Sequence, residues 1–250
     1  SPRGRAEALM GAFSDVFFLS ASAIREYNYE KAYQSLRDAR QLQPLYDACR
    51  NDLVTARGMA QLSWVGKKSR AELDRLAQTL NAVDLAIRND RVFNRRMAST
   101  MAHVQLRPAA LESLAAALES LALATQSVGL GMYSGTEQER AHYMQVARER
   151  LVDLAGTLEP RQMGVASFEG ESLVLMLRLM TVDMLEATGL GHEQASAALV
   201  KLGEAVTEHA PRTSEIPIVQ ANSNQDEQED LRSRTINIIL HDQELEKHPE

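Results

Sequence analysis

The 250-residue chain contains one cysteine, few aromatic side chains and no long uninterrupted apolar run. The single thiol, Cys49, cannot form an internal disulfide, so no disulfide framework supports the fold and a reducing compartment fits. Aromatic residues make up only 5% of the chain, which disfavours a β-rich fold. The most apolar stretches, residues 16–24 and 173–184, fall short of the roughly 20 residues that cross a bilayer. We therefore expect no membrane span within this segment.

Signature patterns for catalysis and metal binding are also missing from the sequence. The six histidines form no His-Glu-x-x-His pair, and one cysteine cannot build a thiolate zinc site. The glycines at 129, 131 and 135 follow a predicted helix and not a strand, so they indicate the end of a helix and not a phosphate loop. No Gly-x-Ser-x-Gly hydrolase elbow occurs. The sequence thus predicts a protein that is not an enzyme and that uses no cofactor or metal.

The net charge of −7 is unevenly distributed along the chain. Residues 1–107 carry 17 basic and 11 acidic side chains, residues 108–210 carry 6 and 14, and residues 211–250 carry 4 and 9. The basic residues of the first part alternate with acidic ones and form no dense patch. Nucleic acid is therefore not an expected partner.

Residues with high helix propensity are abundant, and apolar residues recur every three or four positions. This pattern predicts an all-α fold: a multi-helix bundle of long antiparallel helices over residues 1–210, followed by a polar linker and a largely irregular tail over residues 211–250. The expected helices cover residues 3–27, 30–42, 44–60, 69–104, 136–158, 171–188 and 192–209, and one further helix begins at residue 108 and ends around the glycines at 129, 131 and 135. Pro44 marks a predicted break, and Ser69 with Glu72 and Thr136 with Glu139 are predicted capping boxes.

The predicted helix over residues 69–104 is the part around which the chain is organised. Its apolar stripe is interrupted halfway along by two polar residues and then becomes apolar again. The stripe runs through Leu73, Leu76, Leu80, Val83, Ile87, Asp90, Asn94, Met97, Met101 and Val104. Beside it lies a charged belt that consists of Asp84, Arg88, Arg91 and Arg95. A helix that carries polar residues on both stripes is expected to be packed among other helices.

Two interpretations of these polar residues remain open at this point. In the first, they form a structural polar network that fixes the register of the bundle; its members are Asp84, Asp90, Asn94, Arg178 and Asp183. In the second, Arg88, Arg91 and Arg95 form a substrate-binding anion site, because guanidinium groups grip carboxylates with a planar fork of donors.

The tail carries one short apolar patch among polar residues. It consists of Ile236, Ile238, Ile239 and Leu240. With no predicted sheet to join, this patch is expected to bind a partner protein or to dock on the bundle.

Three stretches resemble a known family. Residues 80–96 are similar to the segment "ALRNARVLARR" of actinobacterial FUSC proteins, the fusaric acid resistance or aromatic acid exporter family. Residues 39–48 are similar to the family's "ARALDPLVDAL", and residues 173–190 to its "VxxxRxxxVDLLRATGL". The resemblance covers about residues 3–205, and it departs from the family pattern at Asp90 and Asn94.

The resemblance implies a cytoplasmic helical domain of a membrane exporter of aromatic or amphipathic carboxylates, with a role in assembly, gating or substrate entry. It places a transmembrane domain before residue 1, at the cytoplasmic face of the inner membrane, and it makes a homo-oligomer expected. Arg3 and Arg5 agree with a cytosolic flank. The alternative is a scaffold module that recruits a cytosolic or cell-envelope partner to the membrane.

Overall fold

The computed structural model describes residues 2–62 and 67–202, and within these ranges it contains seven α-helices and no strand. The helices are α1 (Pro2–Arg25), α2 (Tyr29–Leu62), α3 (Lys67–His103), α4 (Pro108–Tyr133), α5 (Glu137–Ala155), α6 (Phe168–Ala187) and α7 (His192–Ala197). The all-α prediction and the helical bundle are confirmed.

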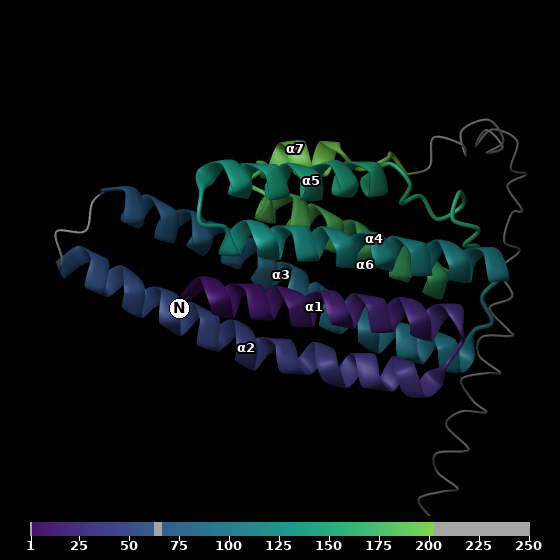
Figure 1. The fold of residues 1–250 in the computed structure, drawn as a ribbon. Coiled ribbons are helices and arrows are strands. Elements are labelled where there is room, and N and C mark those ends of the chain that lie inside the picture. The colour runs from purple at the N-terminus through teal and green to yellow at the C-terminus, as the bar shows by residue number, and fades with distance from the viewer. Residues whose placement is uncertain (1, 63–66, 203–250) are drawn as a thin grey trace, which may run out of the picture. The chain divides into compact units, whose positions relative to one another are not determined.

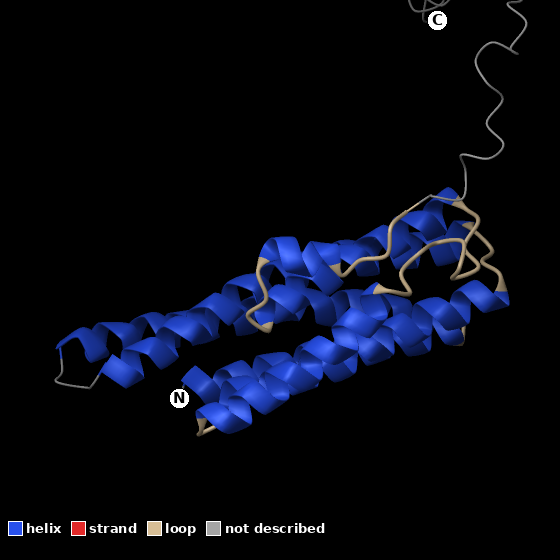
Figure 2. Ribbon diagram, turned by 90° about the horizontal axis from the view of Figure 1, so that it is seen from above, coloured by secondary structure: helices blue, strands red, loops and turns tan. Residues whose placement is uncertain are grey.

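The long helices lie side by side as an antiparallel bundle (Figure 1; the view from above is Figure 2). Helix α1 packs against α4 and α2, α3 packs against α2 and α6, and α5 packs against α4. The predicted stripe of α3 faces this interior, since the eight residues from Leu76 to Met101 along it are all buried. Leu73 and Val104, at the two ends of the stripe, are half-buried.

The predicted break at Pro44 is wrong, because α2 continues through this residue. Pro44 lies on the exposed side of the helix, where water can hydrate the carbonyl that loses its backbone donor. The opposite side of α2 is buried both before and after the proline, at Leu42, Tyr46 and Cys49. Tertiary packing of this face therefore outweighs the local preference for a turn.

Helix α2 and the start of α3 extend past the beginning of α1 (Figure 1). The Sγ of Cys49 lies 3.9 Å from the carbonyl oxygen of Pro2, so α2 residues beyond Cys49 run past the first turn of α1. At 1.5 Å per residue this overhang is about 20 Å long. Helix α3 begins at Lys67 and not at Ser69, so the predicted Ser69 cap is wrong.

The predicted end of α4 around its glycines is confirmed, since the helix ends between Gly131 and Gly135. Gly129 and Gly131 lie inside α4, which continues to Tyr133. A Cβ added at Gly129 would lie 2.8 Å from the Cβ of Met10, and one at Gly131 would lie 3.0 Å from the Cε of Met144. These glycines let α1 and α5 approach α4 closely, and tight packing is the reason that glycine occurs there.

Two other helix boundaries test local signals. The predicted Thr136 cap is confirmed, since its side chain accepts a hydrogen bond from the backbone N–H of Glu139. The expected helix over residues 192–209 ends already at Ala197, and the backbone N–H of Val200 donates instead to the carbonyl of Ala155. The bundle is followed through Leu202, and residues 203–250 lie outside the described part.

Helices α1 and α4 are long and apolar enough to cross a membrane by length and composition. The expectation that no segment is long and apolar enough to cross a bilayer is therefore wrong. In the bundle, 56% of the apolar window of α1 and 61% of that of α4 are buried inside the protein. Core helices of globular proteins show the same combination.

Candidate functional site

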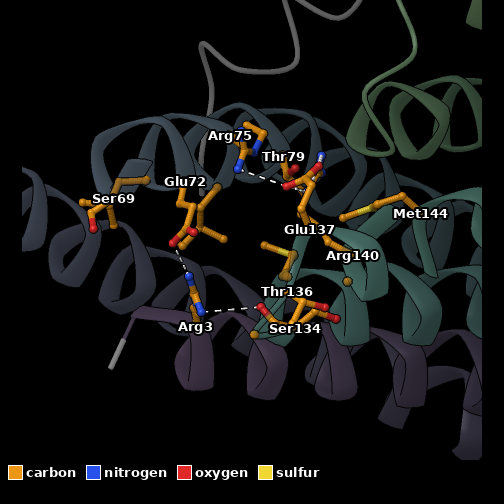
Figure 3. Close-up of a pocket in the computed structure, with 15 residues that line it drawn as sticks. Arg3, Ser69, Glu72, Arg75, Thr79, Ser134, Thr136, Glu137, Arg140 and Met144 are labelled. Atoms are coloured by element: carbon orange, nitrogen blue, oxygen red, sulfur yellow. Dashed lines mark hydrogen bonds and ion pairs between the residues drawn. The ribbon is translucent and has the colours of Figure 1, made fainter. Parts of the chain in front are cut away.

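A pocket of about 180 Å³ lies where the first turns of α1, α3 and α5 meet the end of α4 (Figure 3). We call it the terminal pocket. It is lined by Arg3, Ser69, Glu72, Leu73, Arg75, Leu76, Thr79, Gly131, Met132, Ser134, Gly135, Thr136, Glu137, Arg140 and Met144.

One side of the terminal pocket is closed by Arg3, which links three helix ends. Its Nη2 lies 2.5 Å from the Oε2 of Glu72 on α3. Its Nη1 lies 3.5 Å from the carbonyl oxygen of Ser134, directly after α4. Arg3 therefore connects the start of α1 with α3 and with the end of α4 (Figure 3).

The opposite side is formed by two arginines that share one carboxylate. Arg75 Nη2 lies 3.1 Å from Glu137 Oε2, and Arg140 Nη2 lies 2.7 Å from Glu137 Oε1. The hydrogen bonds from Arg140, together with the positive charges of both arginines, lower the pKa of Glu137. Glu137 therefore stays ionised at neutral pH, as one carboxylate between two guanidinium groups.

Positive charge exceeds negative charge around the terminal pocket. Three arginines face two glutamates, and the Nε of Arg75 is buried without a hydrogen-bond partner among the described residues. A buried donor without a partner costs free energy that an incoming acceptor recovers. The charge and this donor make the pocket suited to a small anion.

The floor of the terminal pocket is apolar. Leu76, Met132 and Met144 are at least nine-tenths buried and present aliphatic and thioether surface. Methionine side chains adapt to the shape of apolar and aromatic groups and contact aromatic rings favourably. The floor thus suits the apolar body of a ligand whose charged end reaches the arginines.

Sequence reasoning missed this pocket. The sequence pattern indicates a membrane flank for Arg3, a capping box for Glu72 and only a helix start for Glu137. Arg3 and Glu72 are 69 positions apart, and no linear spacing signals that such residues meet. The sequence feature that relates to the pocket is indirect, since charged residues lie near the ends of helices that pack side by side.

The predicted anion site on α3 lies elsewhere. Arg88 and Arg95 are exposed, Arg91 is half-buried, and none of them lines the principal pockets in the described part of the chain. The Nη2 of Arg88 lies 2.6 Å from the Oδ2 of Asp84, four residues earlier. The three arginines therefore form an exposed ridge and not a cavity.

Asp90 and Asn94 lie in a fully buried polar cluster that joins three helices. Asn94 Nδ2 donates to Asp90 Oδ1 at 2.9 Å, and Asn94 Oδ1 accepts from Ser20 of α1 at 2.9 Å and from Ser35 of α2. Burial raises the pKa of the Asp90 carboxyl to about 8, although the bond from Asn94 and the charge of Arg91 oppose this rise. Asp90 is therefore largely protonated at neutral pH.

The other two predicted network residues are bound separately. Asp183 is nearly buried and accepts from Asn89 Nδ2 at 2.7 Å, and burial raises its pKa to about 6. Arg178 donates to the carbonyl of Leu158 at 2.7 Å, and burial lowers its pKa. The structure thus brings Asp90 together with Asn94, and it places Asp84, Arg178 and Asp183 in contacts of their own.

The remaining predictions concern metals, thiols and the tail. Among residues 2–62 and 67–202 there is no group of three or more His, Cys, Asp or Glu side chains that could hold a metal ion. Burial raises the pKa of the Cys49 thiol to about 11, so its reactive thiolate is scarce at neutral pH. Ile236, Ile238, Ile239 and Leu240 lie outside the described residues.

No family model matches this chain, and neither the curated proteins nor the solved structures contain a match.

Proposed function

We propose that this chain is the cytoplasmic domain of a membrane exporter of aromatic or amphipathic carboxylates and that the terminal pocket receives the substrate. The observation that carries the proposal is the excess of arginine over glutamate above an apolar floor, with the Nε of Arg75 left without a described partner. The family resemblance of residues 3–205 supports the exporter context.

The pocket chemistry indicates how such a ligand would bind. Its carboxylate would accept hydrogen bonds from Arg75, and Arg140 would add positive charge from the next helix. The ring or alkyl body would lie against Met132 and Met144. A volume of about 180 Å³ is below the roughly 300–1,000 Å³ of drug-sized sites, which favours a small acid.

Isothermal titration of the chain with benzoate and with octanoate tests the pocket. We expect heat of binding with wild type and at least about tenfold weaker binding for Arg75→Gln, because a charge-assisted bond contributes about 1.5–3 kcal/mol. The matched control is Arg91→Gln on the ridge, which should bind as wild type. Loss of binding in the control but not in Arg75→Gln would place the site on the ridge instead, and the absence of heat with wild type would contradict substrate binding by this domain.

A scaffold function is the second candidate, and the overhang of α2 favours it. Val54 and Met59 on this overhang are 62% and 61% exposed, and exposed apolar side chains at a projecting helix end suit contact with another protein. The variant Val54→Ser/Met59→Ser should then reduce the oligomer mass measured by light scattering. An unchanged mass would count against this surface as an oligomer contact.

A further inference from the structure

The outward surface where α3 and α6 lie side by side combines exposed leucines with arginines. We define this outer α3–α6 face by Leu85, Arg88, Arg95 and Arg96 of α3 and by Leu175 and Leu179 of α6. The three leucines are 48%, 46% and 51% exposed. Helix α6 is apolar around most of its circumference, and a helix of this kind is ordinarily covered on all sides.

Two contacts establish that α3 and α6 are neighbours beside this face. Arg96 of α3 donates to Ser172 Oγ of α6, and Asn89 of α3 donates to Asp183 of α6. The helices therefore run antiparallel, with residues 89–96 of α3 beside residues 172–183 of α6. At helical spacing, Leu175 and Leu179 lie one and two turns from Ser172 on the same side of α6, and Ser172 is the residue that Arg96 contacts. Arg88 and Arg95 lie on the same exposed side of α3, toward α2.

The charge of this face is predominantly positive. Arg88 is paired with Asp84, whereas Arg95 has no acidic partner among the described residues. Glu171, in the first turn of α6, is the exposed acidic residue nearest to the leucines along that helix. The three arginines of this face therefore lie near two carboxylates, the paired one of Asp84 and the exposed one of Glu171.

We propose that the outer α3–α6 face binds an anionic lipid bilayer surface, with the leucines entering the interfacial layer and the arginines contacting lipid phosphates. Exposed leucines flanked by arginines are the composition that interfacial binding requires. The principal pockets of the described chain do not include these six residues, and a planar bilayer, unlike a docked helix, requires no groove. Pairing two copies through this face would oppose arginine to arginine, which disfavours a twofold dimer.

This proposal goes beyond the proposed function, because it does not require the terminal pocket to bind a ligand. Its test is sedimentation of the 250-residue chain with vesicles of phosphatidylcholine that contain phosphatidylglycerol, and with vesicles of phosphatidylcholine alone. We expect binding to the anionic vesicles that falls as salt is raised, and little binding to the neutral ones. Equal binding to both, or none to either, would overturn the proposal.

Variants assign the binding to this face. Arg95→Gln/Arg96→Gln should weaken binding by at least about fivefold, since each arginine near the surface contributes about a factor of five. Leu175→Ser/Leu179→Ser should weaken it by at least about tenfold. The matched controls are Arg150→Gln on α5 and Leu123→Ser/Val152→Ser on α4 and α5, which are exposed residues away from this face.

Each variant result has a definite meaning. Loss of binding in the face variants with the controls unchanged supports the proposal. Equal loss in controls and face variants would overturn it. A leucine variant that binds the anionic vesicles as tightly as wild type would show adsorption by charge alone. A wild-type dimer that the leucine variant dissociates would identify a second copy as the occupant. Either result overturns the proposal. All of these substitutions are at exposed positions, and far-ultraviolet circular dichroism confirms that each variant is folded.

Discussion

Glu72 and Asp90 lie on the same face of α3, yet their surroundings differ. They are 18 residues apart, which is five full turns, so both point toward the interior side of the helix. At Asp90 this side is fully buried, the carboxyl accepts one neutral hydrogen bond from Asn94, and Asn94 contacts Ser20 of α1 and Ser35 of α2. At Glu72, where α1 begins and α4 ends, a pocket opens and the carboxylate pairs with Arg3. Where the bundle is closed, a polar residue contributes to stability; where it is open, the same type of residue is available for binding.

The largest expected effect is the pH dependence of stability that Asp90 causes. The folded protein keeps this proton up to about pH 8, whereas the unfolded chain releases it near pH 4. Unfolding therefore releases a proton between these values, and the free energy of unfolding falls as pH rises, by about 1.4 kcal/mol per pH unit. Between pH 5 and 8 we expect a loss of roughly 4 kcal/mol from this group in urea titrations.

The variant Asp90→Asn isolates the contribution of Asp90 to this pH dependence. Asp183, whose pKa is raised to about 6, adds a smaller loss of stability between pH 4 and 6, which the variant keeps. The variant should remove most of the pH slope above pH 6 and keep the remainder. A slope equal to that of wild type would mean that Asp90 is ionised in the folded protein, and the contrast with Glu72 would fail.

The second largest effect is expected for Asn94→Ala. Removing this side chain leaves the hydroxyls of Ser20 and Ser35 and the carboxyl of Asp90 without their shared partner in a fully buried site. We expect a loss of about 3 kcal/mol in the free energy of unfolding, measured with urea at pH 6. The adjacent exposed residue provides the control: Arg95→Ala should change stability by less than about 0.5 kcal/mol. Equal losses would remove the distinction between the cluster and the ridge.

A third prediction concerns close packing next to the terminal pocket. In Gly129→Ala, the new methyl group would lie 2.8 Å from the Cβ of Met10, which cannot rotate away. We expect a destabilisation of about 2 kcal/mol, measured as a lower urea midpoint. Gly11→Ala is the matched control, because a Cβ there meets nothing within 4 Å and a helical alanine is favoured. If both variants are stabilised, the α1–α4 contact is looser than described.

The smallest effect is expected at the open end of α3. Glu72→Gln breaks an ion pair whose side chains are 30% and 39% exposed, and such pairs contribute less than about 1 kcal/mol because solvent screens them. Thermal unfolding should therefore shift by no more than a few degrees at pH 7. Because the variant adds net positive charge to the terminal pocket, benzoate should bind as tightly as to wild type or more tightly. Weaker binding would show that Glu72 contacts the ligand or positions Arg3.

Much of the fold follows from the sequence, and the exceptions have physical causes. The Thr136 cap, the start of α4 at Pro108 and the buried stripe of α3 depend on local chemistry and period, and the sequence carries both. The continuation of α2 through Pro44 depends on the faces of other helices, which no local signal describes. The buried pair Asp90 and Asn94 was visible as a break in the stripe, but the terminal pocket combines side chains from four helices and appears only when the chain is folded.

The most direct test of the terminal pocket is nuclear magnetic resonance of methyl-labelled methionines during titration with benzoate. Met132 and Met144 line the pocket, whereas Met97 and Met101 are buried farther along α3. The account predicts that the first two signals shift in wild type, stay in place in Arg75→Gln, and leave Met97 and Met101 unmoved. Signals of Met132 and Met144 that remain unmoved in wild type at saturating benzoate would contradict it.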